Sequence, residues 1–314
     1  MKRFLLKLSI FLVGILATTL VAWKWMALQP NNYSRYSHEI NVKQQLERIQ
    51  QIHEPKIIFI GGSGCGFGLC SPLIVEHFQM PVVNTGTHAS LGLRMQLQLF
   101  KPFIAENDIV IAIPEYAHYL GDFYLGDETT IRILSSHYIE GYKLLNFKQQ
   151  MHLLKYVPNA YKDARLSRSM KAADSNSPYS AQSLNQYGDV EMYEHREHQK
   201  ISNRRDDMGE SKQLQKESIK LLRDFNQYCI DRGATMLIFP PAFRDEAFEQ
   251  NKEQIGEIWK ALVSNNLPIV SSPSNYELAD SLFYDTDYHL TYEGVIYRTN
   301  KLIADLDSLG IISH

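Results

Sequence analysis

The chain has 314 residues and a mass of 36.2 kDa, which is enough for one large α/β domain or for two smaller domains. Hydrophobic residues make up 44% of it and charged residues 21%, so the composition excludes a disulfide-stapled miniprotein and a wholly disordered chain. The formal net charge is −3; without the first 24 residues, 28 basic and 35 acidic side chains leave −7. This acidic balance argues against nucleic acid as a partner.

The N-terminal segment has the pattern of a membrane anchor. Three of the first seven residues are basic, and the run Leu8–Ala22 that follows carries no charge. Extended to Leu28, this segment reaches roughly the 20 residues that a bilayer-spanning helix needs. We interpret residues 1–28 as an uncleaved anchor rather than a signal peptide, because a peptidase prefers two small side chains before the cut and only Ala22 fits. The basic end would stay in the cytoplasm, which places the rest of the chain on the periplasmic or extracellular face.

After the anchor, residues 29–54 are expected to form a linker and a leading polar helix over His38–Gln51. Short apolar runs rich in β-branched residues then recur along the chain. The middle ones lack alternation, as is typical of strands that are covered on both faces. The five runs are Lys56–Ile60, Pro81–Asn84, Asp108–Ile113, Ala234–Phe239 and Leu267–Val270.

Helical segments separate these runs. Ser71 followed by Pro72 predicts an N-cap with proline at the first helical position, and a helix through Phe78. The segment Lys212–Arg232 has an apolar stripe and is followed by Gly233, a typical C-terminal glycine. This alternation predicts an α/β fold over residues 55–308: a three-layer α/β/α sandwich with a five-stranded parallel sheet, flavodoxin-like in order.

A long insertion, residues 114–211, interrupts this pattern between the third and fourth strands. Its first part is rich in aromatic residues and contains a plausible helix near Phe147–Val157. The later part, Lys162–Ser211, is polar and poor in aliphatic residues. We interpret it as a long, partly mobile lid or partner loop.

Residues with useful chemistry follow the predicted strands. In an open parallel sheet, ligands bind outside the carboxyl ends of the strands, so a serine, a histidine and several carboxylates should meet at one rim. The segments concerned are Gly61–Gly68 with Ser63, Asn84–His88, Pro114–Tyr116, Pro240–Pro241 and Phe283–Leu290 with His289.

Ser63 is the candidate nucleophile. The glycine-rich turn has neither the spacing of a dinucleotide-binding loop nor the lysine and hydroxyl pair of a phosphate loop. Glycine on both sides lets the backbone bend sharply and leaves the hydroxyl open, as a nucleophile requires, although a lone serine in such a turn is often structural. Cys65 is a rival nucleophile in an oxidising exterior, but it also fits a small side chain packed under the turn.

His289 is the candidate base, because two aspartates stand close to it. Either Asp285 or Asp287 could accept a hydrogen bond from Nδ1–H and stabilise the imidazolium, and spacing does not choose between them. Another pair, His195 and His198, has a loose metal-ligand spacing. We interpret that pair as part of a solvated loop and expect no metal site.

These blocks resemble the SGNH/GDSL hydrolase superfamily, specifically its membrane-anchored, extracytoplasmic members found beside exopolysaccharide systems. The likeness covers roughly residues 55–120 and 230–308, and its blocks are Gly61-Gly62-Ser63, Val83–His88 and Asp285–Thr291. By this resemblance, Ser63 is the nucleophile, His289 the base and Asp285 the likelier orienting acid. Main-chain N–H groups near Ser63 and over Gly86–Ala89 would form the oxyanion hole. The resemblance places Asn84, Gly86, His88 and Glu115 at the substrate.

Two positions depart from the family pattern. The family often has aspartate three residues before the histidine, where this chain has Thr286. Many members also have an asparagine that donates to the oxyanion in the third block, where this chain has Pro114-Glu115-Tyr116. An ionised Glu115 would repel the developing negative charge.

The sequence therefore favours a serine-dependent O-acyl esterase or acyltransferase acting on a cell-envelope or exported glycan, with no cofactor and no metal. Its partners would be an O-acylated glycan or acyl donor, and the membrane through the N-terminal helix. The alternative is a non-catalytic, membrane-tethered accessory protein that binds glycan or a polysaccharide-assembly protein.

Overall fold

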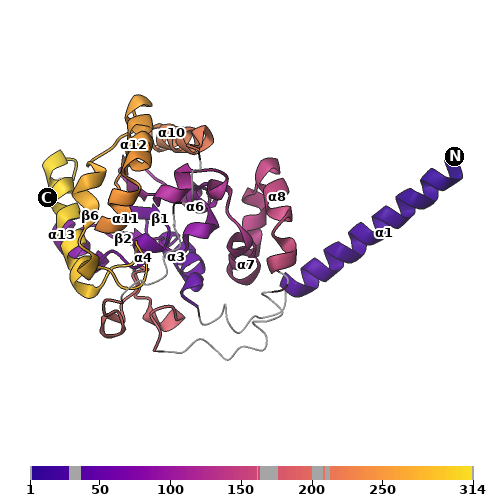
Figure 1. The fold of residues 1–314 in the computed structure, drawn as a ribbon, viewed down its shortest axis with the longest axis horizontal. Coiled ribbons are helices and arrows are strands. Elements are labelled where there is room, and N and C mark those ends of the chain that lie inside the picture. Colours follow the sequence, from indigo (N-terminus) through magenta and orange to yellow (C-terminus); the bar gives the residue numbers. More distant parts are fainter. Residues whose placement is uncertain are drawn as a thin grey trace.

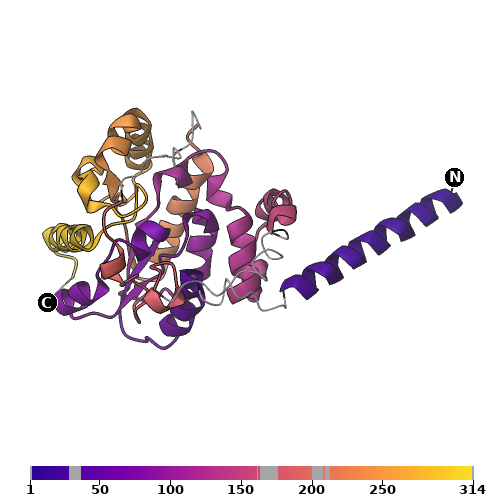
Figure 2. The same ribbon diagram turned by 60° about the horizontal axis from the view of Figure 1, so that its bottom comes forward.

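The computed structural model describes residues 2–27, 37–160, 162, 176–199, 208 and 213–312. Helix α1 (Lys2–Ala27) is drawn apart from the α/β body in both ribbon views (Figures 1 and 2). Across the described residues, no helix is long and apolar enough to cross a membrane. The linker predicted at 29–37 lies outside the described residues except for Ser37.

A parallel sheet of four strands forms the centre of the body. Its strands are β1 (Ile57–Gly61), β2 (Val82–Asn84), β3 (Ile109–Ile113) and β4 (Thr235–Ile238), in the order β2-β1-β3-β4. Each strand lies within one of the predicted apolar runs or one residue beyond it. All their register pairs are parallel, for example Phe59 with Ile111.

The prediction of a fifth strand was wrong. The run Leu267–Val270 forms only one isolated parallel bridge, between Ile269 and Ile238 beside β4. Pro268 has no N–H to donate and only its carbonyl accepts a bond, from Ile238. Two serines and Pro273, which begins a short 3₁₀ turn, follow the run, so the ladder ends after one bridge.

Helices cover both faces of the sheet, which confirms the three-layer part of the prediction. Alternate side chains of β1 point to opposite faces, with Ile58 and Ile60 in one core and Ile57 and Phe59 in the other. The first face is covered by α3 (Asn41–Ile49), α6 (Leu93–Phe100), α10 (Lys216–Asp231) and α12 (Lys252–Ser264). The second face is covered by α5 (Ser71–Phe78) and α13 (Tyr292–Leu309).

The predicted helix ends were partly right. Helix α5 begins at Ser71 and is capped by Cys70, so Ser71 is not the N-cap; its hydroxyl donates to Asp189 instead. The predicted helix over 38–51 is split into a 3₁₀ turn, η1 (His38–Ile40), and α3. After α10, Gly233 has φ +72°, the left-handed conformation expected of a C-terminal glycine.

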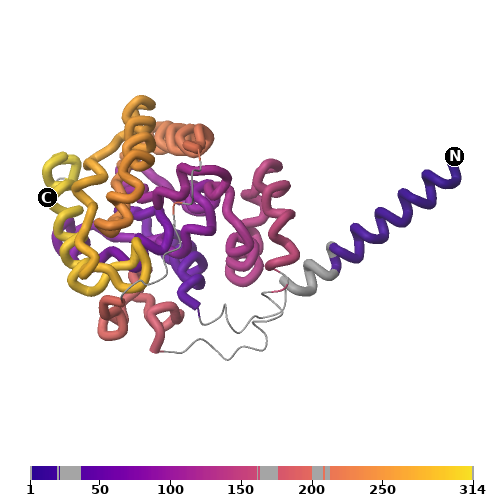
Figure 3. The backbone as a smooth tube through the Cα atoms, viewed as in Figure 1, coloured from indigo at the N-terminus to yellow at the C-terminus, as the bar shows by residue number. Residues whose placement is uncertain are grey.

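The remaining elements surround this body. They are α4 (Ser63–Gly66), α7 (Glu128–His137), α8 (Phe147–Leu154), α11 (Asp245–Gln250) and a small sheet of β5 (Phe243–Arg244) and β6 (Glu277–Leu278). Helix α8 confirms the helix expected near Phe147. Along the chain, α7 and α8 follow β3, and α10 precedes β4; the colours of Figure 3 give this order.

Candidate active site

The candidate active site lies where the winding of the sheet reverses, between β1 and β3. Helix α4 follows β1 and begins with Ser63, and Glu115 follows β3. Ser63 is partly exposed, whereas Gly62 and Gly64 on either side are buried. The topology therefore brings the serine and the glutamate to the rim where the sequence predicts them.

Close backbone contacts explain the glycines around Ser63. A Cβ atom on Gly61 would lie 2.7 Å from the carbonyl oxygen of Ile113, and one on Gly62 would lie 2.9 Å from Cα of Ala89. Real Cβ atoms are not found this close to backbone. The turn can therefore pass between β3 and the loop after β2 only with glycine at these positions.

His289 is held from one side by Asp285. Its Nδ1 lies 2.9 Å from Oδ1 of Asp285, and its main-chain N–H donates to the hydroxyl of Thr286 across 3.0 Å. Burial by itself raises the pKa of Asp285, but hydrogen bonds from His289 and Tyr179 outweigh it and leave that pKa below its usual value. An ionised acceptor at Nδ1 keeps the proton there and leaves Nε2 as the basic nitrogen.

Asp287, which spacing alone left as an equal candidate, has a different partner. Its Oδ1 accepts a hydrogen bond of 2.6 Å from Nε of Arg244, whose side chain is fully buried. Arg244 also contacts Asp280 and Glu246. Asp285 is therefore the aspartate that contacts His289, and Asp287 belongs to a buried ion pair beside the small sheet.

Tyr179 joins the same cluster from the insertion. Its hydroxyl donates to Oδ2 of Asp285 across 2.5 Å and lies 3.0 Å from Nδ1 of His289. Sequence reasoning missed this residue, because it stands in a polar stretch with no motif around it. The one available signal was that Tyr179 is a single aromatic residue in the run NSPYSAQS.

The segments that carry Ser63 and His289 contact each other, but no hydrogen bond joins the two residues. The imidazole stacks on Phe67 with ring centroids 4.1 Å apart, and the N–H of Phe67 donates to the carbonyl of Ser63, one helical turn back. A Cβ atom on Gly64 would lie 3.5 Å from Cβ of Tyr288, the neighbour of His289. Within the described residues, Nε2 of His289 has no hydrogen-bond partner; in free enzymes a serine–histidine contact is often long.

Glu115 contacts the turn that carries Ser63. Its Oε1 accepts a hydrogen bond of 3.0 Å from the N–H of Gly64, and its side chain is buried. On the other side of the same residue, the buried Arg298 donates to the carbonyl of Gly64 across 2.6 Å. Gly64 is therefore held between an acidic and a basic side chain.

The expected oxyanion donors divide into occupied and open groups. The N–H of Gly64 is bonded to Glu115, and the N–H of Gly86 donates to Oδ1 of Asn84 across 3.0 Å. The N–H groups of Ser63, Thr87, His88 and Ala89 have no acceptor among the described residues. These main-chain donors are the ones left for a developing negative charge.

The other residues expected at the substrate have structural contacts. Asn84 is completely buried, and its amide donates to the carbonyl of Cys65 at 3.1 Å and to Asp189 at 2.7 Å. Gly86 packs with its backbone against Cys65. The Nδ1 atom of His88 accepts from the N–H of Ser90 at 3.1 Å, and burial lowers the pKa of His88. Asn84 therefore lies beneath the rim rather than on it.

Residues 176–199, which belong to the predicted lid or partner loop over 162–211, are packed against the core. Asp189 is fully buried and accepts from the hydroxyl of Ser71 as well as from Asn84. The buried Arg196 donates to the carbonyls of Phe67 and Leu290. Buried charged side chains therefore tie this part of the predicted lid or partner loop to the body, and its mobility stays a prediction. The rest of 162–211 lies outside the described residues except for Lys162 and Met208.

Two further candidates from the sequence have ordinary contacts. Cys65 is buried, and burial raises the pKa of its thiol to about 12, so it fits the packing role rather than that of a nucleophile. His198 contacts the carbonyl of Phe283 at 2.8 Å and a carboxylate oxygen of Asp280 at 3.3 Å.

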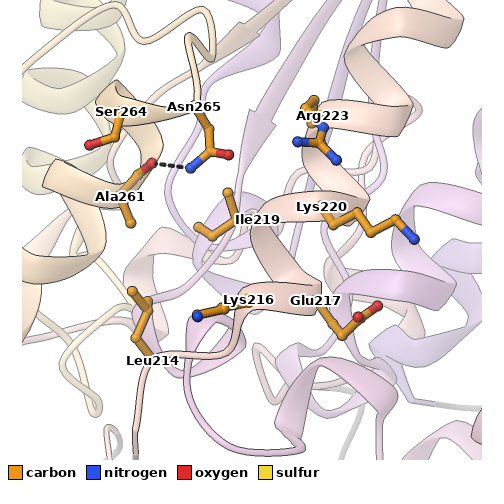
Figure 4. A pocket seen from close by; sticks show the side chains of 9 residues that line it. All are labelled: Leu214, Lys216, Glu217, Ile219, Lys220, Arg223, Ala261, Ser264 and Asn265. Atoms are coloured by element: carbon orange, nitrogen blue, oxygen red, sulfur yellow. Dashed lines mark hydrogen bonds between the residues drawn. The ribbon is translucent and has the colours of Figure 1, made fainter.

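A surface hollow of about 470 Å³ lies between α10 and α12. It is lined by the apolar side chains of Leu214 and Ile219 and by three cations, Lys216, Lys220 and Arg223 (Figure 4). None of the predicted site residues is in its wall. It is therefore separate from the Ser63 and His289 cluster.

Comparison with known proteins does not assign the chain to a family. No family model matches the chain, and no curated protein matches it.

Proposed function

We propose that this protein is a serine-dependent O-acyl esterase or acyltransferase. The observation that carries the proposal is the arrangement of His289: Asp285 holds its Nδ1 at 2.9 Å, and the ring stacks on Phe67, one turn after Ser63. A histidine ordered in this way, with Nε2 unbonded among the described residues, has the form of a general base for a nearby hydroxyl.

In the proposed reaction, Ser63 Oγ attacks the carbonyl carbon of an ester while Nε2 of His289 takes the hydroxyl proton. The ionised Asp285 stabilises the imidazolium that forms. When the tetrahedral intermediate collapses, the carbon–oxygen bond to the alcohol breaks and His289 returns the proton to that alcohol. The acyl group is left on Ser63. Attack by a sugar hydroxyl or by water, again deprotonated by His289, then releases it.

The negative oxygen of the intermediate needs hydrogen-bond donors. The N–H groups of Ser63 and Ala89 are among those that fit this task, because neither has an acceptor among the described residues. The ionised form of Glu115, bonded to Gly64, would weaken the same site by repulsion. The proposed enzyme is therefore expected to be slow.

The glycan substrate and the location are further parts of the proposal. They are supported by the resemblance of the three sequence blocks to membrane-anchored SGNH/GDSL proteins of exopolysaccharide systems. The basic N-terminal residues and the uncharged run Leu8–Ala22 support a body that lies outside the cytoplasm, tethered to the membrane. A reporter fused to the C-terminus tests this location: activity of a reporter that works only outside the cytoplasm supports it, and activity of a cytoplasmic one contradicts it.

The central test is active-site labelling of the full chain with a fluorophosphonate probe. We expect a single label on Ser63, and its loss in Ser63→Ala and in His289→Asn. Ser90→Ala and His198→Asn are matched controls that should label as the unaltered chain does, since neither residue contacts the Asp285 and His289 pair. Equal labelling of Ser63→Ala would overturn the proposal.

A second candidate function is a non-catalytic, tethered accessory protein that binds glycan or a polysaccharide-assembly protein. The hydrogen bond from Gly64 to Glu115 favours it, because a carboxylate stands beside the expected oxyanion position. Complementation of a deletion strain separates the two. If Ser63→Ala and His289→Ala restore the phenotype as well as the unaltered gene, the accessory role is correct.

A further inference from the structure

Tyr179 stands out as the residue whose contacts the proposed reaction does not yet use. It is the one described insertion side chain that contacts both Asp285 and His289, with its hydroxyl 2.5 Å from the aspartate and 3.0 Å from Nδ1 of the histidine. Its ring lies 5.1 Å from that of Phe67, on which the imidazole also stacks. Tyr179 therefore borders the base, its orienting acid and the turn of Ser63.

The hydroxyl of Tyr179 can act only as a donor to Asp285. Burial and the neighbouring Asp285 raise the pKa of Tyr179 far above its usual value, so the phenol keeps its proton. With Oδ2 accepting from Tyr179 and Oδ1 facing Nδ1 of His289, both carboxylate oxygens have a partner. The plane of the carboxylate, and with it the direction of the imidazole, is thus set by two contacts rather than one.

The backbone around Tyr179 is itself fixed. Its carbonyl accepts from the N–H of His38 at 2.9 Å, and Ser180 forms an antiparallel bridge with Ser37. Further along the segment, Arg196 donates both to the carbonyl of Phe67 and to that of Leu290, next to His289. This segment therefore ties the turn of Ser63 to the loop of His289.

We infer that Tyr179 is a positioning residue for the His289 and Asp285 pair, supplied by the insertion rather than by the α/β body. The inference rests on the acyl-transfer function proposed above. The site then depends on the packing of residues 176–199 against the body. Without that segment, Asp285 loses one of its two hydrogen bonds, and the imidazole loses its contact with the ring of Tyr179.

The experiment compares Tyr179→Phe with Tyr187→Phe in the full chain. Both remove one phenol hydroxyl from the same segment, but no hydrogen bond of the Tyr187 hydroxyl exists within the described residues, and its ring lies under Arg48. Phenylalanine at 179 keeps the ring packing against Phe67. Any difference between the two variants therefore reports on the hydroxyl that Asp285 accepts.

The first measurement is the proton resonance of the His289 Nδ1–H group, assigned by its absence in His289→Asn. We expect it to move in Tyr179→Phe and to stay in place in Tyr187→Phe. The second is the rate of Ser63 labelling at saturating fluorophosphonate, which should fall roughly tenfold in Tyr179→Phe, as expected for loss of one hydrogen bond to a charged group. The probe concentration for half-maximal rate should not change.

The two measurements separate the inference from the proposed function. If the unaltered chain takes no label, the acyl chemistry is wrong, and the resonance alone decides whether Tyr179 positions His289. If the resonance of Tyr179→Phe coincides with that of the unaltered chain, the inference is overturned, whatever the labelling rate does.

Discussion

The main-chain N–H of Gly64 donates a hydrogen bond to Oε1 of Glu115 across 3.0 Å. Gly64 directly follows the candidate nucleophile Ser63, and its N–H is where an acyl-transfer enzyme would be expected to bind the oxyanion. A carboxylate in that place competes with the substrate oxygen for the donor and adds a like charge beside it. Variants of Glu115 therefore distinguish the proposed catalytic function from the accessory one.

Glu115→Gln is expected to increase the rate of Ser63 labelling. The amide keeps the size of the side chain and an acceptor for Gly64, but it removes the negative charge. Since one oxyanion donor is worth on the order of 10²–10³ in rate, relief of this repulsion should raise the rate at least tenfold. Mass-resolved labelling kinetics at several probe concentrations measure it.

Glu115→Ala serves as the control for this change, because it removes both the charge and the acceptor. We expect a lower melting temperature in that variant, since the buried N–H of Gly64 loses its partner. A slower rate in Glu115→Gln with unchanged stability would mean that the charge of Glu115 is needed, which contradicts the repulsion argument.

Asp285 and Asp287 are expected to differ sharply when each is changed to asparagine. Asp285→Asn should reduce Ser63 labelling by roughly 10³-fold or more, because an amide cannot hold the imidazolium as a carboxylate does, and it should lower stability less than Asp287→Asn does. Asp287→Asn should retain labelling but lower the free energy of unfolding by about 2 kcal/mol, since the buried Arg244 loses one of its three carboxylate partners.

Urea unfolding and labelling of the two aspartate variants, measured side by side, check this pair of expectations. Loss of labelling in Asp287→Asn at full stability would reverse the two roles.

Stability should fall between about pH 6.5 and about pH 4 because two histidines are buried in neutral form. Burial lowers the pKa of both His38 and His118 from 6.5 to about 4. The Nε2 atom of each faces a carbonyl, at 3.2 Å and 2.8 Å, and Nδ1 of each is buried without a partner within the described structure. The unfolded chain therefore binds more protons in this window, and stability is full above pH 6.5 and falls as the pH drops.

Each histidine adds at most about 1.4 kcal/mol per pH unit to this slope. His118→Asn should make the dependence shallower by up to that amount, as measured by urea unfolding between pH 7 and pH 4.5. The exposed His53 provides the control, and His53→Asn should leave the slope as it is. An identical slope in His118→Asn would refute the assignment.

Asp189→Ala is expected to release the insertion from the body. The carboxylate is fully buried and accepts from Ser71 and Asn84 at 2.7 Å each and from Asn185 at 3.1 Å. Its removal leaves buried donors without a partner, at a cost on the order of 3 kcal/mol. Limited trypsin digestion should then cut at Arg196, which is buried in the unaltered chain. Ser71→Ala removes only one of these donors and should have a smaller effect on both measurements.

Much of the fold could be predicted from the sequence because strands and helices leave local patterns. The unbroken apolar runs of β1 and β3, the stripe of α10 and the glycine at 233 depend only on neighbouring residues. The parallel order of the strands predicted Ser63 and Glu115 at one rim, whereas His289 follows a run that forms no strand of the main sheet, so its position depends on tertiary packing. The fifth strand failed because strand pairing also needs a partner edge and N–H groups, which Pro268 interrupts.

Contacts between distant parts of the chain were decided by the tertiary structure alone. Spacing treated Asp285 and Asp287 alike, and only packing turned one toward His289 and the other toward Arg244. Tyr179 meets His289 from 110 positions away, out of a polar stretch without periodicity. A hydrophobic pattern records which faces are buried, whereas side-chain partners of this kind depend on the three-dimensional path of the chain, and for that reason the sequence determined the rim but not its full set of residues.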